Sequence, residues 1–191
     1  PWLMNVLLIA LFGIQHSVMA RSGFKKKLTR YINEPFERST YLISTSIPII
    51  LLLVFWQPIE GHIWQSSNST IISIGLGFAI LGWALVLFTT FLINHFDLFG
   101  LRQIFCYTKN LPYLPVPFHT PSAYRVVRHP MQLGVVIGIF STATMTAGHF
   151  LLACGITLYI IIGLYFEERD LIKSFGERYR AYQVTVPRLI P

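Results

Sequence analysis

Charged side chains are scarce in this chain of 191 residues, and they are unevenly distributed. Only 12% of the residues are Asp, Glu, Lys or Arg, whereas 53% are hydrophobic, and the mean hydropathy is +0.57. No charged residue occurs between Met131 and Phe166. Soluble domains carry about twice this share of charge, so the composition indicates a single integral membrane domain over residues 1–191.

Cysteines are also few, and their spacing argues against several kinds of site. Cys106 and Cys154 are the only two, and they do not form a CxxC pair. A disulfide framework and a thiolate zinc site are therefore not predicted, and we expect no metal. The histidines form no HxxxH or HxxH pair, which argues against a di-iron desaturase.

The net charge of +7 does not indicate nucleic-acid binding, because the basic residues flank apolar segments. All 15 lysines and arginines lie in the 21–38 loop, in the 94–130 connection or after Phe166. The connections at 58–70 and 146–149 carry none. By the positive-inside rule, the three basic segments lie on the cytoplasmic side of the membrane.

Five transmembrane helices are predicted from the uncharged segments. Three of them cover residues 1–20, 39–57 and 71–93. A single helix over 131–166 would run about 54 Å, roughly twice the hydrocarbon core, so this segment must fold back as a hairpin. We expect its bend at 146–149, the N-terminus outside and the C-terminus in the cytoplasm. A signal peptide at 1–20 is disfavoured because the basic region follows the apolar run.

Two further segments complete a predicted all-α, polytopic membrane helix bundle. The 94–130 connection contains five prolines and is too long for a simple turn, so we expect a long cytoplasmic connection that forms a lid or site wall. After Phe166, apolar residues spaced three and four apart predict a C-terminal amphipathic helix that packs on the bundle. The alternative for this helix is an anchor on the membrane surface.

Polar groups at the predicted cytoplasmic ends of the spans are candidates for a site. Arg128 and His129 precede Pro130, which suits a helix start, so basic side chains and backbone amides would converge on an anion such as a carboxylate. Contact with lipid headgroups is the alternative. Glu167 and Glu168 directly follow an apolar span, where an unpaired carboxylate is costly. A pair with Arg128 or a bound cation would account for them.

Several of these residues carry a resemblance to a known superfamily. The chain resembles the isoprenylcysteine carboxyl methyltransferase superfamily of integral membrane methyltransferases through Arg128-His129-Pro130, Gly134, Glu167-Glu168, Leu171, Phe175-Gly176, Tyr179, Tyr182 and Val186-Pro187. Gln132 stands where that superfamily's familiar motif has an aromatic residue, which disfavours the branch acting on prenylated proteins. The segments 12–17, 37–40 and 94–103 resemble the bacterial methanethiol S-methyltransferases.

The resemblance implies methyl transfer from S-adenosylmethionine (SAM) to a small thiol, giving dimethyl sulfide from methanethiol. It implies a bacterial inner-membrane enzyme whose active site faces the cytoplasm, and neither a nucleic acid nor an obligate protein partner is expected. Arg128 and His129 would hold the methionine end of SAM, and Glu168 its ammonium or ribose hydroxyls. The full set of implied cofactor-binding residues is Tyr124, Arg128, His129, Pro130, Glu167, Glu168, Tyr179 and Tyr182.

A thiol must lose its proton to become a good nucleophile. The pKa of a free cysteine is about 8.5, so a base or a cationic neighbour is useful at neutral pH. The candidates near the predicted cytoplasmic face are His16, His95 and Asp97 with Arg102. The alternative is that these residues only hold the 94–130 segment in place.

Three other functions stay open from the sequence. A related methyltransferase could act on a prenylated cysteine carboxylate or a lipid amine and keep the same fold and cofactor. A membrane reductase could use a nicotinamide cofactor in a similar bundle. A non-enzymatic scaffold or transporter would need neither cofactor, but the cytoplasmic clustering of polar groups argues against it.

Overall fold

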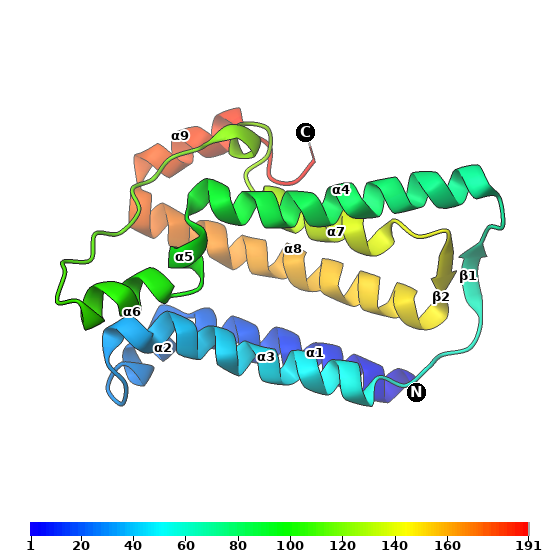
Figure 1. Ribbon diagram of the computed structural model, residues 1–191, viewed down its shortest axis with the longest axis horizontal. Coiled ribbons are helices and arrows are strands. Elements are labelled where there is room, and N and C mark those ends of the chain that lie inside the picture. The colour runs from blue at the N-terminus through cyan, green and yellow to red at the C-terminus, as the bar shows by residue number, and fades with distance from the viewer. Residues whose placement is uncertain (191) are drawn as a thin grey trace. The chain divides into compact units, whose positions relative to one another are not determined.

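A computed structural model describes residues 1–190, most of which are helical (Figure 1). Within this range four helices are long and apolar enough to cross a membrane. They are α1 (Trp2–Ala20), α3 (Glu37–Phe55), α4 (Ser69–Ile93) and α8 (Ala147–Phe175). The first three coincide with predicted spans to within about two residues at each end, the usual uncertainty of helix boundaries.

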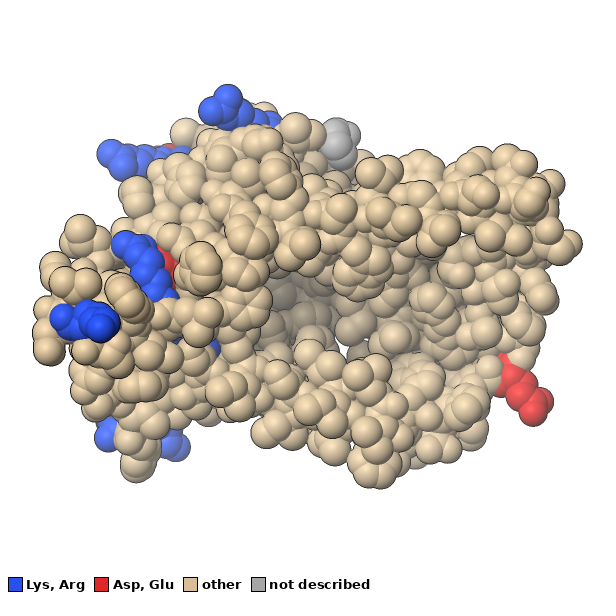
Figure 2. Space-filling view, viewed as in Figure 1, with Lys and Arg blue, Asp and Glu red and all other residues tan. Residues whose placement is uncertain are grey.

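The surface of α4 illustrates why these helices belong in a bilayer. Its 25 residues include no charged side chain, and large apolar residues such as Leu81 and Trp83 are more than half exposed. In the space-filling view the region over α4 likewise shows no Lys, Arg, Asp or Glu (Figure 2). An apolar surface this extensive is stable against lipid and not against water, so the chain is an integral membrane protein.

The chain divides into two compact units. Unit 1 contains residues 1–58 and 94–116, and unit 2 contains residues 59–93 and those from 117 onward. The prediction of a single domain over residues 1–191 stays a prediction.

Unit 1 is built on an antiparallel pair of helices, α1 and α3. Near the start of α1, the Asn5 side chain donates to the carbonyl of Gln57 at 2.8 Å and accepts from its amide at 2.9 Å, just beyond the end of α3. Late in α1, His16 contacts the hydroxyl of Tyr41 near the start of α3. Asn5 is fully buried, so this double hydrogen bond satisfies a polar side chain that would otherwise be costly.

The remaining elements of unit 1 are short. The 21–38 loop holds α2 (Ser22–Leu28) and the 3₁₀ turn η1 (Glu34–Phe36), and the 94–130 connection begins with α5 (His95–Leu98) and α6 (Leu101–Thr108). Gly100 joins α5 to α6 with a φ of +77°, and a Cβ there would lie 2.6 Å from Ser39 Oγ. Arg38 donates to the carbonyl of Leu98 at 2.9 Å, so these short helices dock on the start of α3.

Unit 2 pairs α4 with α7 (Pro130–Phe140) and adds α8. The predicted hairpin is present, but its bend is not where we expected it. α7 ends at Phe140 and α8 already begins at Ala147, where Thr146 caps the helix by accepting from the amide of His149 at 3.1 Å. The turn therefore covers residues 141–146 instead of 146–149.

A small antiparallel sheet explains the early end of α7 and departs from the predicted all-α fold. Strand β1 (His62–Gln65) pairs with β2 (Thr144–Thr146), with His62 opposite Thr146 and Gln65 opposite Thr144. Trp64 also donates its indole N–H to the carbonyl of Thr142 at 2.9 Å. The segment after α7 thus satisfies its backbone through a partner about 80 residues away in the sequence, which local patterns do not indicate.

The C-terminal region is not the single amphipathic helix predicted after Phe166. α8 continues through Glu167 and Glu168 to Phe175. Gly176, with a φ of +57°, then ends it, and a separate helix α9 (Glu177–Thr185) follows. The break lets α9 turn back toward the chain around residues 122–130.

Candidate active site

The C-terminal segment of unit 2 lies beside the residues that precede α7. The amide of Arg128 donates to the carbonyl of Pro187 at 2.9 Å, and the amide of His129 donates to the carbonyl of Arg188 at 3.2 Å. Pro130 is the first residue of α7 and is buried, as its missing N–H and fixed φ allow. These two backbone hydrogen bonds bring Arg128, His129 and Arg188 together.

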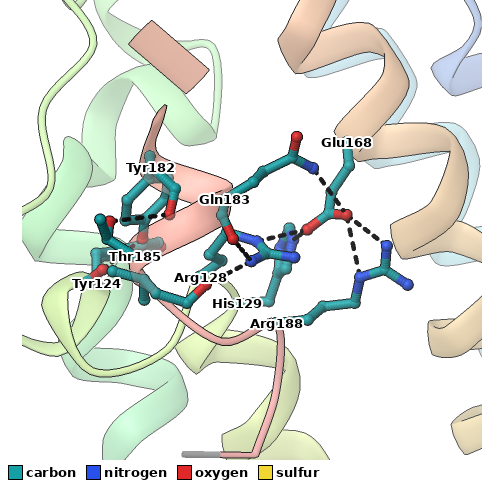
Figure 3. A network of polar contacts seen from close by, with 9 residues as sticks. Tyr124, Arg128, His129, Glu168, Tyr182, Gln183, Thr185 and Arg188 are labelled. Carbon is teal, nitrogen blue, oxygen red and sulfur yellow. Dashed lines mark hydrogen bonds and ion pairs between the residues drawn. The ribbon is translucent and has the colours of Figure 1, made fainter. Parts of the chain in front are cut away.

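Glu168 is the centre of the resulting network (Figure 3). Its Oε1 accepts from Arg128 Nε at 2.7 Å and lies 3.2 Å from His129 Nε2. Its Oε2 accepts from Arg188 Nη2 at 2.6 Å and Nε at 3.0 Å, and from Gln183 Nε2 at 3.2 Å. The predicted pair between Arg128 and Glu168 is therefore present.

The charges in this network do not cancel. Glu168 has a side chain only 3% exposed and contributes one negative charge, whereas Arg128 and Arg188 contribute two positive charges. A buried carboxylate is tolerated here because two charge-assisted partners replace its water. A carboxylate offers about four acceptor positions, and the chain's own donors already occupy them. The cluster thus keeps about one positive charge that suits an anionic ligand.

Arg128 also fixes the end of α9. Its Nη1 donates to the carbonyl of Gln183 at 3.0 Å and to the carbonyl of Val186. Tyr182 of α9 donates its hydroxyl to the carbonyl of Tyr124 in the 3₁₀ turn η2 (Ser122–Arg125). Residues from η2, the start of α7, the end of α8 and α9 therefore form one continuous site.

Aromatic rings lie next to this polar network. The ring centroid of Phe118 lies 5.1 Å from that of Phe175, 6.0 Å from that of Tyr179 and 5.7 Å from that of Tyr182. Tyr179 is only 2% exposed, and among residues 1–190 its hydroxyl has no hydrogen-bond partner. An unpaired buried hydroxyl is costly, and a ligand that hydrogen-bonds there would remove that cost.

Burial keeps these tyrosines in the neutral form. It raises the pKa of Tyr124 and of Tyr182 to about 12, and nearby Glu167 adds to the effect on Tyr124. Burial also raises the pKa of Tyr179, and the charge of Glu168 acts in the same direction. At neutral pH the three side chains therefore offer hydroxyl groups and uncharged rings.

Glu167 lies in a different environment from Glu168. It is exposed, although it directly precedes the buried Glu168 in α8.

The four candidates for thiol activation all belong to unit 1. His16 contacts Tyr41, and its ring stacks on Phe12 at a centroid distance of 5.6 Å. The Arg102 guanidinium donates to Asp97 at 2.8 Å, so these two candidates form an ion pair.

His95 lies at an apolar groove of unit 1. Its ring centroid is 4.8 Å from that of Phe99. The groove has a volume of about 390 Å³ and is lined by Ser39, Leu42, Ile43, His95, Phe96, Phe99 and Leu101. Apart from Ser39 and His95 these lining residues are apolar, a composition common in binding sites for small molecules.

Sequence reasoning missed three residues of the site. Arg188 and Gln183 contact Glu168, and Phe118 packs on the two tyrosines of α9. Arg188 directly follows Val186-Pro187, which is part of the resemblance, but nothing local indicates its partner. Only the break at Gly176 brings Arg188 back to Glu168.

Comparison with known proteins finds relatives over almost the whole chain. It is 43% identical to methanethiol S-methyltransferase 1 of Bradyrhizobium diazoefficiens over 99% of its own length and 66% of that protein's length. It is 44% identical to the methanethiol S-methyltransferase of Mycobacterium tuberculosis, over 98% of this chain and 77% of that one. Nurim of Bos taurus is 24% identical over 90% of this chain and 68% of that protein. No family model and no solved structure matches the chain.

Proposed function

Because this chain belongs to the family of methanethiol S-methyltransferases, we propose that it transfers a methyl group from SAM to methanethiol and releases dimethyl sulfide. It would do so as a single membrane domain in the bacterial inner membrane. The observation that carries the proposal is the net positive cluster that Arg128 and Arg188 form around the buried Glu168, in a chain with such relatives.

The residues of unit 2 fit SAM in three respects. The excess positive charge of the cluster suits the carboxylate of its methionine part. The unpaired hydroxyl of Tyr179 offers a buried donor and acceptor. The rings of Tyr124, Tyr179, Tyr182 and Phe118 suit a sulfonium, since aromatic faces attract cations. When bound, SAM supplies an electrophilic methyl group.

The side chains of unit 2 would then have distinct roles. Arg128 provides positive charge beside the methionine end, the His129 ring lies next to it, and Pro130 sets the direction of α7. Glu168 has no acceptor position left, so in this proposal it orients the two arginines. A hydrogen bond from the ligand's ammonium to Glu168 would require one of its present hydrogen bonds to open. Glu167 is exposed and would act through its charge near Tyr124.

The methyl acceptor requires an apolar binding place and a group that accepts the thiol proton. The groove that contains His95 offers the first, because its other lining residues are almost all apolar. His16, His95 and the Asp97–Arg102 pair stay the candidates for the second. A histidine is the better base of these, since its unperturbed pKa of about 6.5 lies closer to that of a thiol than a carboxylate's does.

For the membrane arrangement we propose five passes, with the N-terminus outside and the site facing the cytoplasm. α7 has 11 residues and would cover about 16 Å as a helix, roughly half of the hydrocarbon core. Residues 141–146 continue from α7 to the start of α8, and residues 144–146 of this segment form strand β2. We propose that α7 and this segment together complete the fifth pass.

The decisive experiment is incubation of the purified protein with SAM and a panel of acceptors, followed by mass spectrometry of the products. The panel contains methanethiol, longer alkanethiols, a prenylcysteine and a lipid amine. We expect dimethyl sulfide from methanethiol and slower reaction as the alkyl chain lengthens. Methylation of the prenylcysteine or the lipid amine without methanethiol turnover would overturn the proposed acceptor.

A further inference from the structure

Arg188 differs from Arg128 in how far its guanidinium is exposed to a possible ligand. Arg128 is 9% exposed and uses Nε and Nη1 to hold Glu168 and two backbone carbonyls. Arg188 is 45% exposed, and both of its hydrogen bonds go to Glu168. Among residues 1–190, Nη1 of Arg188 and Nη2 of Arg128 both have no hydrogen-bond partner, so the two arginines differ in how far a ligand can reach the free nitrogen.

The free part of Arg188 has a defined orientation. The Nε and Nη2 edge of a guanidinium faces Glu168, which leaves the opposite edge, formed by Nη1 and the second N–H of Nη2. In the close-up the third nitrogen of Arg188 points away from Glu168 (Figure 3). The carbonyl of Arg188 accepts from the amide of His129, so the backbone of this residue is fixed as well. Such an edge matches the two oxygens of a carboxylate.

We propose that Arg188 recognises the carboxylate of the methionine part of the methyl donor and so determines which adenosyl sulfonium compounds the site accepts. This inference rests on the proposed function. Arg128 supplies charge and position, and Glu168 holds Arg188 by one edge so that the other edge is presented without much loss of side-chain entropy. The site then selects donors with a carboxylate against otherwise identical donors without one.

The test compares SAM with decarboxylated SAM, which keeps the sulfonium, the adenosine and the amine but lacks the carboxylate. Affinities are measured by calorimetry on the full-length protein in detergent, so no turnover is needed. The unmodified protein should bind SAM at least tenfold more tightly than decarboxylated SAM, the usual size of one charge-assisted pair. S-adenosylhomocysteine has the carboxylate but no sulfonium, so loss of the Arg188 guanidinium should weaken its binding by about the same factor as that of SAM.

The variant Arg188→Gln should weaken SAM binding tenfold or more and change the affinity for decarboxylated SAM by less than about twofold. Arg188→Lys keeps the charge without the planar edge and should fall between the two. The matched control is Arg180→Gln in α9, whose exposed side chain pairs with Glu177 at 3.2 Å. It should leave both affinities unchanged. Retained binding of decarboxylated SAM also reports that the site of each variant is folded.

The possible contrary results are distinct from one another. Equal weakening of both ligands by Arg188→Gln would overturn the inference and leave Arg188 with a role in folding. Equal affinity of the unmodified protein for both ligands would overturn it as well, while leaving SAM as the donor. Failure of the unmodified protein to bind SAM would overturn the proposed function and this inference together.

Discussion

Gly82 of α4 and Gly134 of α7 lie so close together that neither position has room for a side chain. A Cβ on Gly134 would lie 2.6 Å from the carbonyl oxygen of Gly82, and a Cβ on Gly82 would lie 2.7 Å from the carbonyl oxygen of Gly134. The atoms in the way belong to the backbone, so no rotamer change can relieve the overlap. Close backbone approach through small residues is how helices pack in a membrane, where no hydrophobic force drives them together.

Gly82→Ala should therefore destabilise unit 2 through overpacking, by about 1–3 kcal/mol. Thermal unfolding in detergent should show a midpoint several degrees lower. Gly77→Ala is the matched control, because Gly77 lies on the same helix with no atom within 4 Å of an added Cβ. A loss of stability equal in both variants would mean that the contact with α7 contributes nothing.

Glu168→Gln should unfold the site more severely than any other single charge removal in it. The substitution leaves Arg128 and Arg188 near each other without the carboxylate between them, and breaking a buried pair in this way costs about 3–5 kcal/mol. Chemical denaturation followed by circular dichroism measures the change. The control is Glu177→Gln, which removes the acidic partner of the surface pair with Arg180. The Glu177 side chain is 89% exposed, so this substitution should cost less than about 1 kcal/mol.

Stability should fall at high pH as the tyrosines of the site ionise on unfolding. The pKa of Tyr182 is about 12 in the folded protein against an ordinary value of 10.0, so the folded state holds the proton more tightly. The contribution of Tyr182 to the free energy of unfolding is complete below pH 10.0 and is lost as the pH rises toward about 12. Tyr182→Phe should reduce the dependence of the unfolding midpoint on pH in that range, and an unchanged profile would contradict this.

The five-pass topology predicts a cytoplasmic C-terminus. A cytoplasmic reporter fused after Pro191 should be active, and a periplasmic reporter inserted in the 58–70 connection should be active as well. All Lys and Arg lie in segments placed on the cytoplasmic side by this topology. Periplasmic activity of a reporter fused after Pro191 would reverse the assignment.

A base among His16, His95 and Asp97 should matter most where the thiol is least ionised. Variants His16→Ala, His95→Ala and Asp97→Asn, each saturated with SAM, are compared at pH 7 and at pH 9. Loss of the true base should lower turnover more at pH 7, because at pH 9 a larger share of the thiol ionises unaided. His62→Ala, on the exposed strand β1, is the control. Equal losses at both pH values would leave the residue with a positioning role.

The sequence by itself determined the membrane class and the positions of α1, α3 and α4, and it singled out several residues of the candidate site. Each of these depends on a property of consecutive residues. A run of about 20 apolar residues has no stable alternative to a spanning helix, since every backbone polar group in lipid must be satisfied within the segment. Arg128, His129, Pro130 and Glu168 were singled out as candidates because they adjoin such runs and match a known pattern.

Only the tertiary structure decided where α7 ends, where the helical segment after Phe166 breaks, and which groups surround Glu168. Residues 144–146 form a strand because 62–65 supply its hydrogen-bond partners, and α9 turns back because Gly176 adopts a positive φ. Arg188 reaches Glu168 only after that turn, 20 residues away in the sequence. The net positive charge of the site follows from this contact, and contacts between distant residues depend on the folded chain rather than on local pattern.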